Sequence, residues 1–135
     1  MAIAKESEDS IIIAGDLVDA LDKKILEKPK NKKEAFQMLK CLSGKNFRMI
    51  AGLAVYNTKT KKMLSTAKEC KVKFRDLLDK EIKHYVESCD VTKHAGGFDV
   101  NGAIRFAENI SGEFCLYGLP MNELVHFLRE QGVDV

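Results

Sequence analysis

Apolar residues change their spacing along the chain, and these changes predict alternating strands and helices. Residues 11–21 begin with three consecutive isoleucines and continue with Leu and Val, which is typical of a β-strand. The polar residues 22–24 predict a tight turn, and Ile25 and Leu26 a short return strand that ends at Pro29. The pattern therefore predicts a hairpin.

The aspartates of this segment leave a helical alternative open. Asp16, Asp19 and Asp22 recur at every third position, so in a helix they would share one face. The isoleucine run at 11–13 and the early Gly15 favour the strand. A buried strand does not normally tolerate a carboxylate at its end unless something binds it, so Asp16 raises the question of a site.

Three later segments carry apolar residues at helical intervals. Asn31 can cap a helix over residues 32–42, and Asp79 is expected to cap a second helix. Pro120 suits the start of the last helix, which Gly132 would end. The buried stripes expected of the three helices are Ala35, Met38, Leu39 and Leu42; Ile82, Tyr85 and Val86; and Met121, Leu124, Val125 and Leu128.

Two strand-like runs lie between the first two helices. They span residues 47–56 and 63–74, and the polar loop 57–61 between them predicts a hairpin. Lys71, Lys73 and Arg75 alternate with Val72 and Phe74, so one side of the second run is basic. A solvated hairpin face is the favoured interpretation. A nucleic-acid surface is the alternative, but 7% aromatic residues and no tryptophan offer few stacking platforms.

Length and composition are those of one ordinary domain. The 135 residues are 45% hydrophobic and 31% charged, and the alternating elements predict a single α/β domain over residues 1–135. A net charge of +2 is too small to indicate a nucleic-acid or membrane partner. No stretch approaches the roughly 20 apolar residues of a membrane span, and the start lacks a signal-peptide core, so a cytoplasmic location is expected.

The cysteines and histidines show no metal-ligand spacing. Cys41, Cys70, Cys89 and Cys115 are widely separated, and none of the three histidines stands beside them at a ligand interval. Reduced and mostly buried thiols are therefore expected.

Two stretches break the pattern of a small α/β domain. One is the segment from Asp16 to Lys28, which could be a reaction site or only a hairpin. The other is KHAGGFDVNGAIRF, residues 93–106, where three glycines stand among polar groups and could let the backbone approach a ligand closely. It matches neither the GxxxxGK[ST] nor the GxGxxG phosphate motif, so its own signal is weak. The donors that it could offer to a phosphate or a base edge are Lys93, His94 and Asn101.

Five short blocks follow one another in an order that is more specific than any one of them. They are GDLVDALDKKILEKP (15–29), LSGK (42–45), FRDL (74–77) with Glu81, Ile82 and Tyr85, AGGF (95–98) with Asn101 and Gly102, and GLP (118–120). This order resembles the Maf family of house-cleaning nucleoside triphosphate pyrophosphatases, whose blocks read roughly ADTVV…GKP, LSGR, FRxL…EIxxY, KAGGYxIQG and GLP. The resemblance implies an α/β fold with a Maf- and inosine triphosphatase-like mixed sheet and flanking helices, N-terminally truncated relative to the family.

The resemblance also implies roles for individual residues. Asp16 takes the place of the family's catalytic aspartate and would hold a divalent metal ion, Mg²⁺ or Mn²⁺, or orient the attacking water. Lys28 takes the place of the GKP lysine, which acts as a point charge on phosphate oxygens. Asn101 stands where the family has the IQG glutamine, and His94 where it has the KAG lysine, with Lys93 beside it as a substitute; all three would bind substrate.

The implied reaction cleaves a nucleoside triphosphate between its α- and β-phosphates, and the AGGF form of the loop favours the branch that acts on dTTP and UTP. Several family groups are absent, however. The S-x-S-P-R-R motif, an acidic residue and a lysine have no counterpart in the fifteen residues before Asp16. Leu17, Phe47 and Ala51 replace the threonine of ADT, a histidine and a second threonine.

Two functions therefore stay open. One is an active pyrophosphatase whose missing groups come from a partner chain or from a longer gene product. The other is a catalytically weak or inactive relative that binds nucleotide or associates with itself. A homodimer is expected, because lost strand partners would leave a sheet edge exposed. A small RNA-binding protein is a distant third interpretation that rests only on the Lys-rich hairpin.

Overall fold

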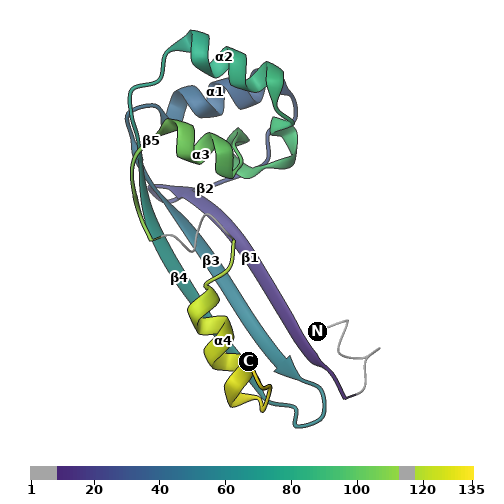
Figure 1. The fold of residues 1–135 in the computed structure, drawn as a ribbon. Helices are drawn as coiled ribbons and strands as arrows, with labels where there is room; N and C mark the ends of the chain where they lie inside the picture. Colours follow the sequence, from purple (N-terminus) through teal and green to yellow (C-terminus); the bar gives the residue numbers. More distant parts are fainter. Residues whose placement is uncertain (1–8, 113–117) are drawn as a thin grey trace.

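An antiparallel sheet runs through the part of the chain that the structure, a computed structural model, describes, namely residues 9–112 and 118–135. Its strand order is β2-β1-β3-β4-β5. Figure 1 shows three long strands extending away from a cluster of helices: β1 (Ile11–Leu21), β3 (Asn46–Asn57) and β4 (Met63–Phe74). The α/β class is confirmed, although the pairings among the described strands are all antiparallel and not mixed.

The first hairpin leaves most of β1 at the edge of this sheet. β1 pairs with β3 from Ile11 to Ala20, whereas β2 (Lys24–Leu26) pairs only with residues 19–21. The turn between them is tight because Asp22 adopts a positive φ of 55°, a conformation that a short polar side chain tolerates. Within the described residues, positions 11–18 therefore have a strand partner on one side only.

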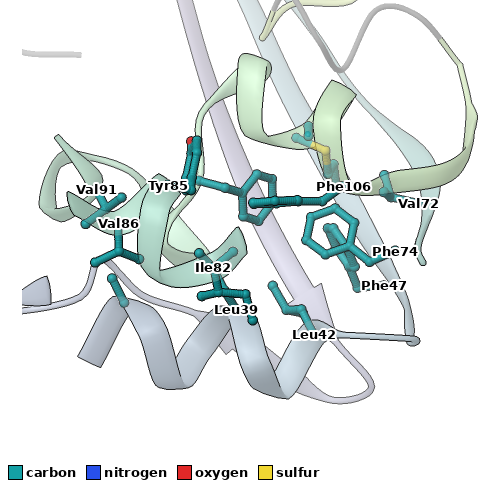
Figure 2. Packing of buried hydrophobic residues seen from close by; sticks show 14 of the residues in the cluster. Leu39, Leu42, Phe47, Val72, Phe74, Ile82, Tyr85, Val86, Val91 and Phe106 are labelled. Carbon is teal, nitrogen blue, oxygen red and sulfur yellow. The ribbon is translucent and has the colours of Figure 1, made fainter. Parts of the chain in front are cut away.

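The main core lies where the helical cluster packs against one end of the long hairpin that β3 and β4 form. α1 (Lys32–Leu42), α2 (Asp79–Ser88) and α3 (Val100–Phe106) enclose it, with the short turns η2 (Val91–Lys93) and η3 (Ala95–Gly97) beside them. Figure 2 shows its aromatic and aliphatic side chains, among them Leu39, Leu42, Phe47, Phe74, Ile82, Tyr85 and Phe106. The Phe47 and Phe74 rings meet edge to face at 4.8 Å, a favoured aromatic geometry.

A smaller core lies farther along the sheet. There α4 (Met121–Glu130) packs on β3, and Leu124 contacts Leu53 and Val55. The short β5 (Ala107–Ser111) pairs with β4 at the opposite edge of the sheet from β2. The two cores leave between them a stretch of β1 that neither covers completely.

The helix predictions are confirmed in place and partly wrong in detail. Asn31 caps α1 as predicted, because its side chain accepts a hydrogen bond from the Glu34 N–H at 2.8 Å. Asp79 is not a cap: Leu78 holds that position, and Asp79 is the first helical residue, with its carboxylate 3.2 Å from Lys40. Met121 of α4 is 47% exposed, since this helix contacts the sheet along one narrow side.

The cysteines only partly match the expectation of buried, reduced thiols. Cys41 is free and exposed, and Cys89 is free and half-buried. Cys70 is fully buried but disulfide-bonded. The expectation for Cys115 lies outside the described residues. Among the helices of residues 9–112 and 118–135, none has the length and apolar character that crossing a membrane requires.

Candidate active site

A cleft of about 770 Å³ opens between β1 and the helical cluster, a size suited to a small-molecule ligand. We call its two sides the strand wall and the helical wall. The strand wall consists of Gly15, Asp16, Leu17, Asp19, Lys28 and Met49. The helical wall consists of Lys93, His94, Ala95, Phe98, Asp99, Val100 and Ala103. Gly118 and Leu119, just before α4, also line the cleft.

The hairpin explains why Asp16 and Lys28 lie on the same wall. The β1–β2 register places Asp19 opposite Leu26. Lys28 follows Leu26, the last residue of β2, by two positions. A carboxylate and an ammonium group separated by twelve positions are thereby brought to one cleft, which both of them line.

Asp16 lies in the part of β1 that pairs with β3 alone. Its Oδ1 atom accepts a hydrogen bond from the Leu17 N–H at 2.9 Å. Asp16 is exposed to solvent. One oxygen thus has a backbone partner, as in a purely structural aspartate, while the edge position leaves the group accessible from the cleft.

Lys28 is exposed and follows β2 at the mouth of the cleft. Among the hydrogen bonds and ion pairs of residues 9–112 and 118–135, none involves its ammonium group. The adjacent Pro29 is buried and fixes the chain at this point. An anchored backbone with an unpaired ammonium group suits the binding of an anion.

Asp19 is the residue that sequence reasoning missed. It is only 5% exposed, and its buried Oδ1 atom has no hydrogen-bond partner within the described part of the chain. Burial raises the pKa of its carboxyl group to about 7. The sequence does carry a signal that Asp19 is buried. Alternation along β1 puts Asp19 on the same face as Leu17 and Leu21, which pack against the main core. A carboxylate on an apolar strand face is unusual.

The helical wall is held together by a satisfied network. The Tyr85 hydroxyl donates to the Asp99 carboxylate at 2.6 Å, and the same carboxylate accepts from the Gly102 N–H at 2.9 Å, which caps α3. Burial pushes the pKa of Asp99 up, but these hydrogen bonds outweigh it and hold the pKa below its usual range. Burial, and then the bond to Asp99, raise the pKa of Tyr85.

The glycines of the loop at 93–106 serve packing more than ligand approach. A Cβ atom on Gly97, whose φ is 81°, would lie 3.3 Å from the Ala35 backbone in α1. A Cβ atom on Gly102 would lie 2.5 Å from the Tyr85 hydroxyl oxygen. Neither glycine lines the cleft. They allow α3 and η3 to sit close to α1 and α2, and this brings the helical wall into position.

The predicted substrate-binding residues are not all brought together. Lys93 and His94 line the cleft, although the Lys93 ammonium group also pairs with Asp90 at 2.9 Å, which raises the pKa of Lys93. Asn101 is exposed and does not line the cleft. Val100 and Ala103 occupy the cleft side of α3, so the residue after Val100 is turned away by the helical repeat.

The donor set fits a metal ion that arrives with a phosphate ligand better than a dedicated metal cage. Within residues 9–112 and 118–135, no three His, Cys, Asp or Glu side chains are grouped to hold one. Asp16 and Asp19 are three strand positions apart, roughly 10 Å, so they cannot share an ion. Mg²⁺ commonly binds one or two carboxylates, substrate phosphates and waters, and the exposed Asp16 carboxylate is compatible with that mode.

The basic side of β4 gives no support to nucleic-acid binding. Lys73 pairs with Glu108 at 3.3 Å, and Arg75 pairs with Glu81. These acidic partners neutralise part of the positive charge, as on an ordinary solvated sheet face.

Comparison with known proteins gives a consistent picture. A family model described as Maf-like protein matches residues 1–131. A dTTP/UTP pyrophosphatase of Clostridium botulinum strain Kyoto is 39% identical over 134 residues, which are 96% of this chain and 68% of that protein. A dTTP/UTP pyrophosphatase of strain Alaska E43 is 38% identical over 130 residues, 93% of this chain and 68% of that protein.

Proposed function

The chain belongs to the Maf family, and on that premise we propose that it is a nucleoside triphosphate pyrophosphatase for pyrimidine nucleotides such as dTTP and UTP. It would hydrolyse them to the nucleoside monophosphate and pyrophosphate. The observation that carries the proposal is the cleft in which Asp16 and Lys28 line one wall. The names of the two Clostridium relatives support the choice of pyrimidine substrates.

Lys28 would bind the triphosphate. Its ammonium group has no ion-pair partner among the described residues, and phosphoryl transfer depends mainly on positioning and charge stabilisation. As the bond between the α- and β-phosphates breaks, negative charge accumulates on the leaving pyrophosphate. A fixed ammonium group stabilises that charge more than it stabilises the ground state.

Asp16 would orient the attacking water and hold the divalent metal ion that accompanies the nucleotide. Its Oδ1 atom accepts a hydrogen bond from the Leu17 N–H, which orients the carboxylate. A bound Mg²⁺ or Mn²⁺ would neutralise phosphate charge and polarise the phosphorus–oxygen bonds. Lys93 and His94 would contact phosphate or base from the helical wall, whereas Asn101 has only the family resemblance in its favour.

The proposal is tested by a turnover screen that measures pyrophosphate release. We expect release from dTTP and UTP with Mg²⁺ or Mn²⁺, and a loss of at least about a hundredfold in kcat for Asp16→Asn and for Lys28→Ala. Asp22→Asn and Lys30→Ala are matched controls, because both residues are exposed, close in sequence and outside the cleft. Nucleotide binding without turnover, or equal losses in the controls, would contradict the proposal.

The homodimer also remains a prediction. The edge of β1 over residues 11–18 is unpaired in the described part of the chain, and exposed strand edges favour association. Light scattering coupled to size exclusion would measure the mass in solution, and a monomer at all concentrations would contradict this prediction.

A further inference from the structure

Asp19 is a buried titratable group for which the proposed reaction has no use. It lies in the strand wall opposite Met49 of β3 and Leu26 of β2, two apolar neighbours. Its side chain is 5% exposed, and its Oδ1 atom has no hydrogen-bond partner within the described residues. This buried oxygen atom borders the cleft, so a bound ligand can supply the hydrogen-bond partner that it lacks.

The charged groups around the cleft do not compensate the Asp19 carboxylate. Asp16 lies on the strand edge and is itself acidic, and Asp99 is engaged by Tyr85 and Gly102. Lys93 pairs with Asp90. The remaining basic side chains that line the cleft are Lys28 and His94, and neither has a hydrogen bond or ion pair with Asp19. Burial without a cation raises the pKa of Asp19 to about 7.

A nucleotide selects the neutral form of this group. The triphosphate carries several negative charges, so an ionised Asp19 in the same cleft would repel it, whereas a protonated carboxyl group does not. The protonated group also gains a function, because its O–H can donate to an oxygen. Phosphate oxygens and base carbonyl oxygens are both acceptors.

We propose that Asp19 is a substrate-contacting residue of this cleft that binds the nucleotide as a neutral carboxyl group and donates a hydrogen bond to a phosphate or base-carbonyl oxygen. The inference rests on the proposed function, since it takes a nucleoside triphosphate as the ligand. It makes affinity depend on pH through this one side chain. Ionisation of Asp19 weakens binding and leaves the chemical step unchanged.

The kinetic test is the pH dependence of KM and kcat between pH 6 and 9. For the wild type we expect KM to rise above pH 7 by up to about tenfold per pH unit, with little change in kcat from this group. Asp19→Asn keeps the shape and a neutral donor, so its KM should stay flat. Asp19→Val lacks the donor and should show a KM about tenfold higher at every pH. His94→Gln should keep the rise, which excludes the imidazole as its source.

Two results would overturn the proposal. If Asp19→Asn loses kcat at every pH, the group acts as a base in the chemical step and not as a neutral donor. If Asp19→Asn retains the wild-type rise of KM, the titrating group lies elsewhere. Circular dichroism of each variant shows that it is folded before kinetics are compared.

A binding experiment keeps the test independent of turnover. Calorimetry with a non-hydrolysable α,β-methylene analogue of UTP, in buffers of different ionisation enthalpy, should show uptake of about three-quarters of a proton at pH 7.5. Asp19→Asn should show no such uptake, and equal uptake in both proteins or none in the wild type would overturn the inference. Uptake without any turnover would instead contradict only the proposed function. Inorganic triphosphate as the ligand should give the same uptake if the acceptor is a phosphate oxygen, and none if it is a base carbonyl.

Discussion

The two walls of the cleft differ in how completely their polar groups are satisfied. On the helical wall, Asp99 is held by the Tyr85 hydroxyl and the Gly102 N–H. On the strand wall, Asp19 has a buried oxygen without a partner in the described residues, and Asp16 is bonded only through one oxygen. Folding normally pairs buried polar groups, so groups left unpaired beside a cleft are candidates for contact with a ligand. The comparison suggests that the helical wall holds the cleft in shape, whereas the strand wall carries the residues that take part in the reaction.

The largest expected effect on stability comes from the unsatisfied Asp19. Its pKa is about 7 in the folded protein and near the ordinary value of 3.8 in the unfolded chain. Between these values the folded state binds more protons, so the free energy of unfolding falls as pH rises from about 4 to 7 and is flat above. The total loss is on the order of 4 kcal/mol.

Urea unfolding at several pH values measures this dependence. Asp19→Asn should remove most of it and should be more stable than the wild type at pH 8. The wild type and Asp19→Asn share all other titrating groups, so the difference between their unfolding midpoints isolates Asp19. A difference that stays constant between pH 4 and 8 would show that Asp19 is not an uncompensated buried acid.

A smaller effect is expected when the satisfied wall is disturbed. Tyr85→Phe removes the hydroxyl that Asp99 accepts from, which should cost about 1–2 kcal/mol of unfolding free energy and raise the pKa of Asp99. Gly102→Ala should act on the same contact, because its new Cβ atom would displace the Tyr85 hydroxyl. The double variant should therefore be less destabilised than the sum of the two. Strict additivity would show that the two residues do not share this contact.

The smallest effect of a substitution is expected at an exposed residue of the helical wall, Lys93. Lys93 is 74% exposed in its side chain, and its pair with Asp90 lies in solvent. Lys93→Ala should leave the melting temperature unchanged and raise KM by a few fold through the loss of one phosphate-facing charge. The rise should shrink at high salt. A KM that does not respond to the substitution would remove Lys93 from the substrate-binding residues.

Local signals in the sequence predict most of the fold. The strand boundaries of the long hairpin follow from its alternating apolar residues, and Asn31 follows from its capping chemistry. Asp79 could not be distinguished from a cap, because acidic residues are favoured both at the cap and within the first turn. The exposure of Met121 depends on how much of α4 the sheet covers, which helical periodicity does not report.

The site was less predictable than the fold. The family resemblance implies that Asp16 and Lys28 act together, and both of them line the one cleft. Asn101 was placed by family resemblance, but the rotation of α3 carries it away from the cleft. In the sequence Asp19 is one of three evenly spaced aspartates, and its burial depends on the packing of the core against β1, a tertiary property.

The most direct measurement compares Asp16→Asn with Asp99→Ala, each assayed in parallel for kcat of pyrophosphate release and for the midpoint of urea unfolding. If the strand wall reacts and the helical wall only positions, Asp16→Asn loses at least about a hundredfold in kcat at an unchanged midpoint. Asp99→Ala lowers the midpoint by the loss of a helix cap, about 1 kcal/mol, and keeps kcat within about threefold while folded. The reverse pattern, a stable but inactive Asp99→Ala and an active Asp16→Asn, would contradict the assignment of the reaction to the strand wall.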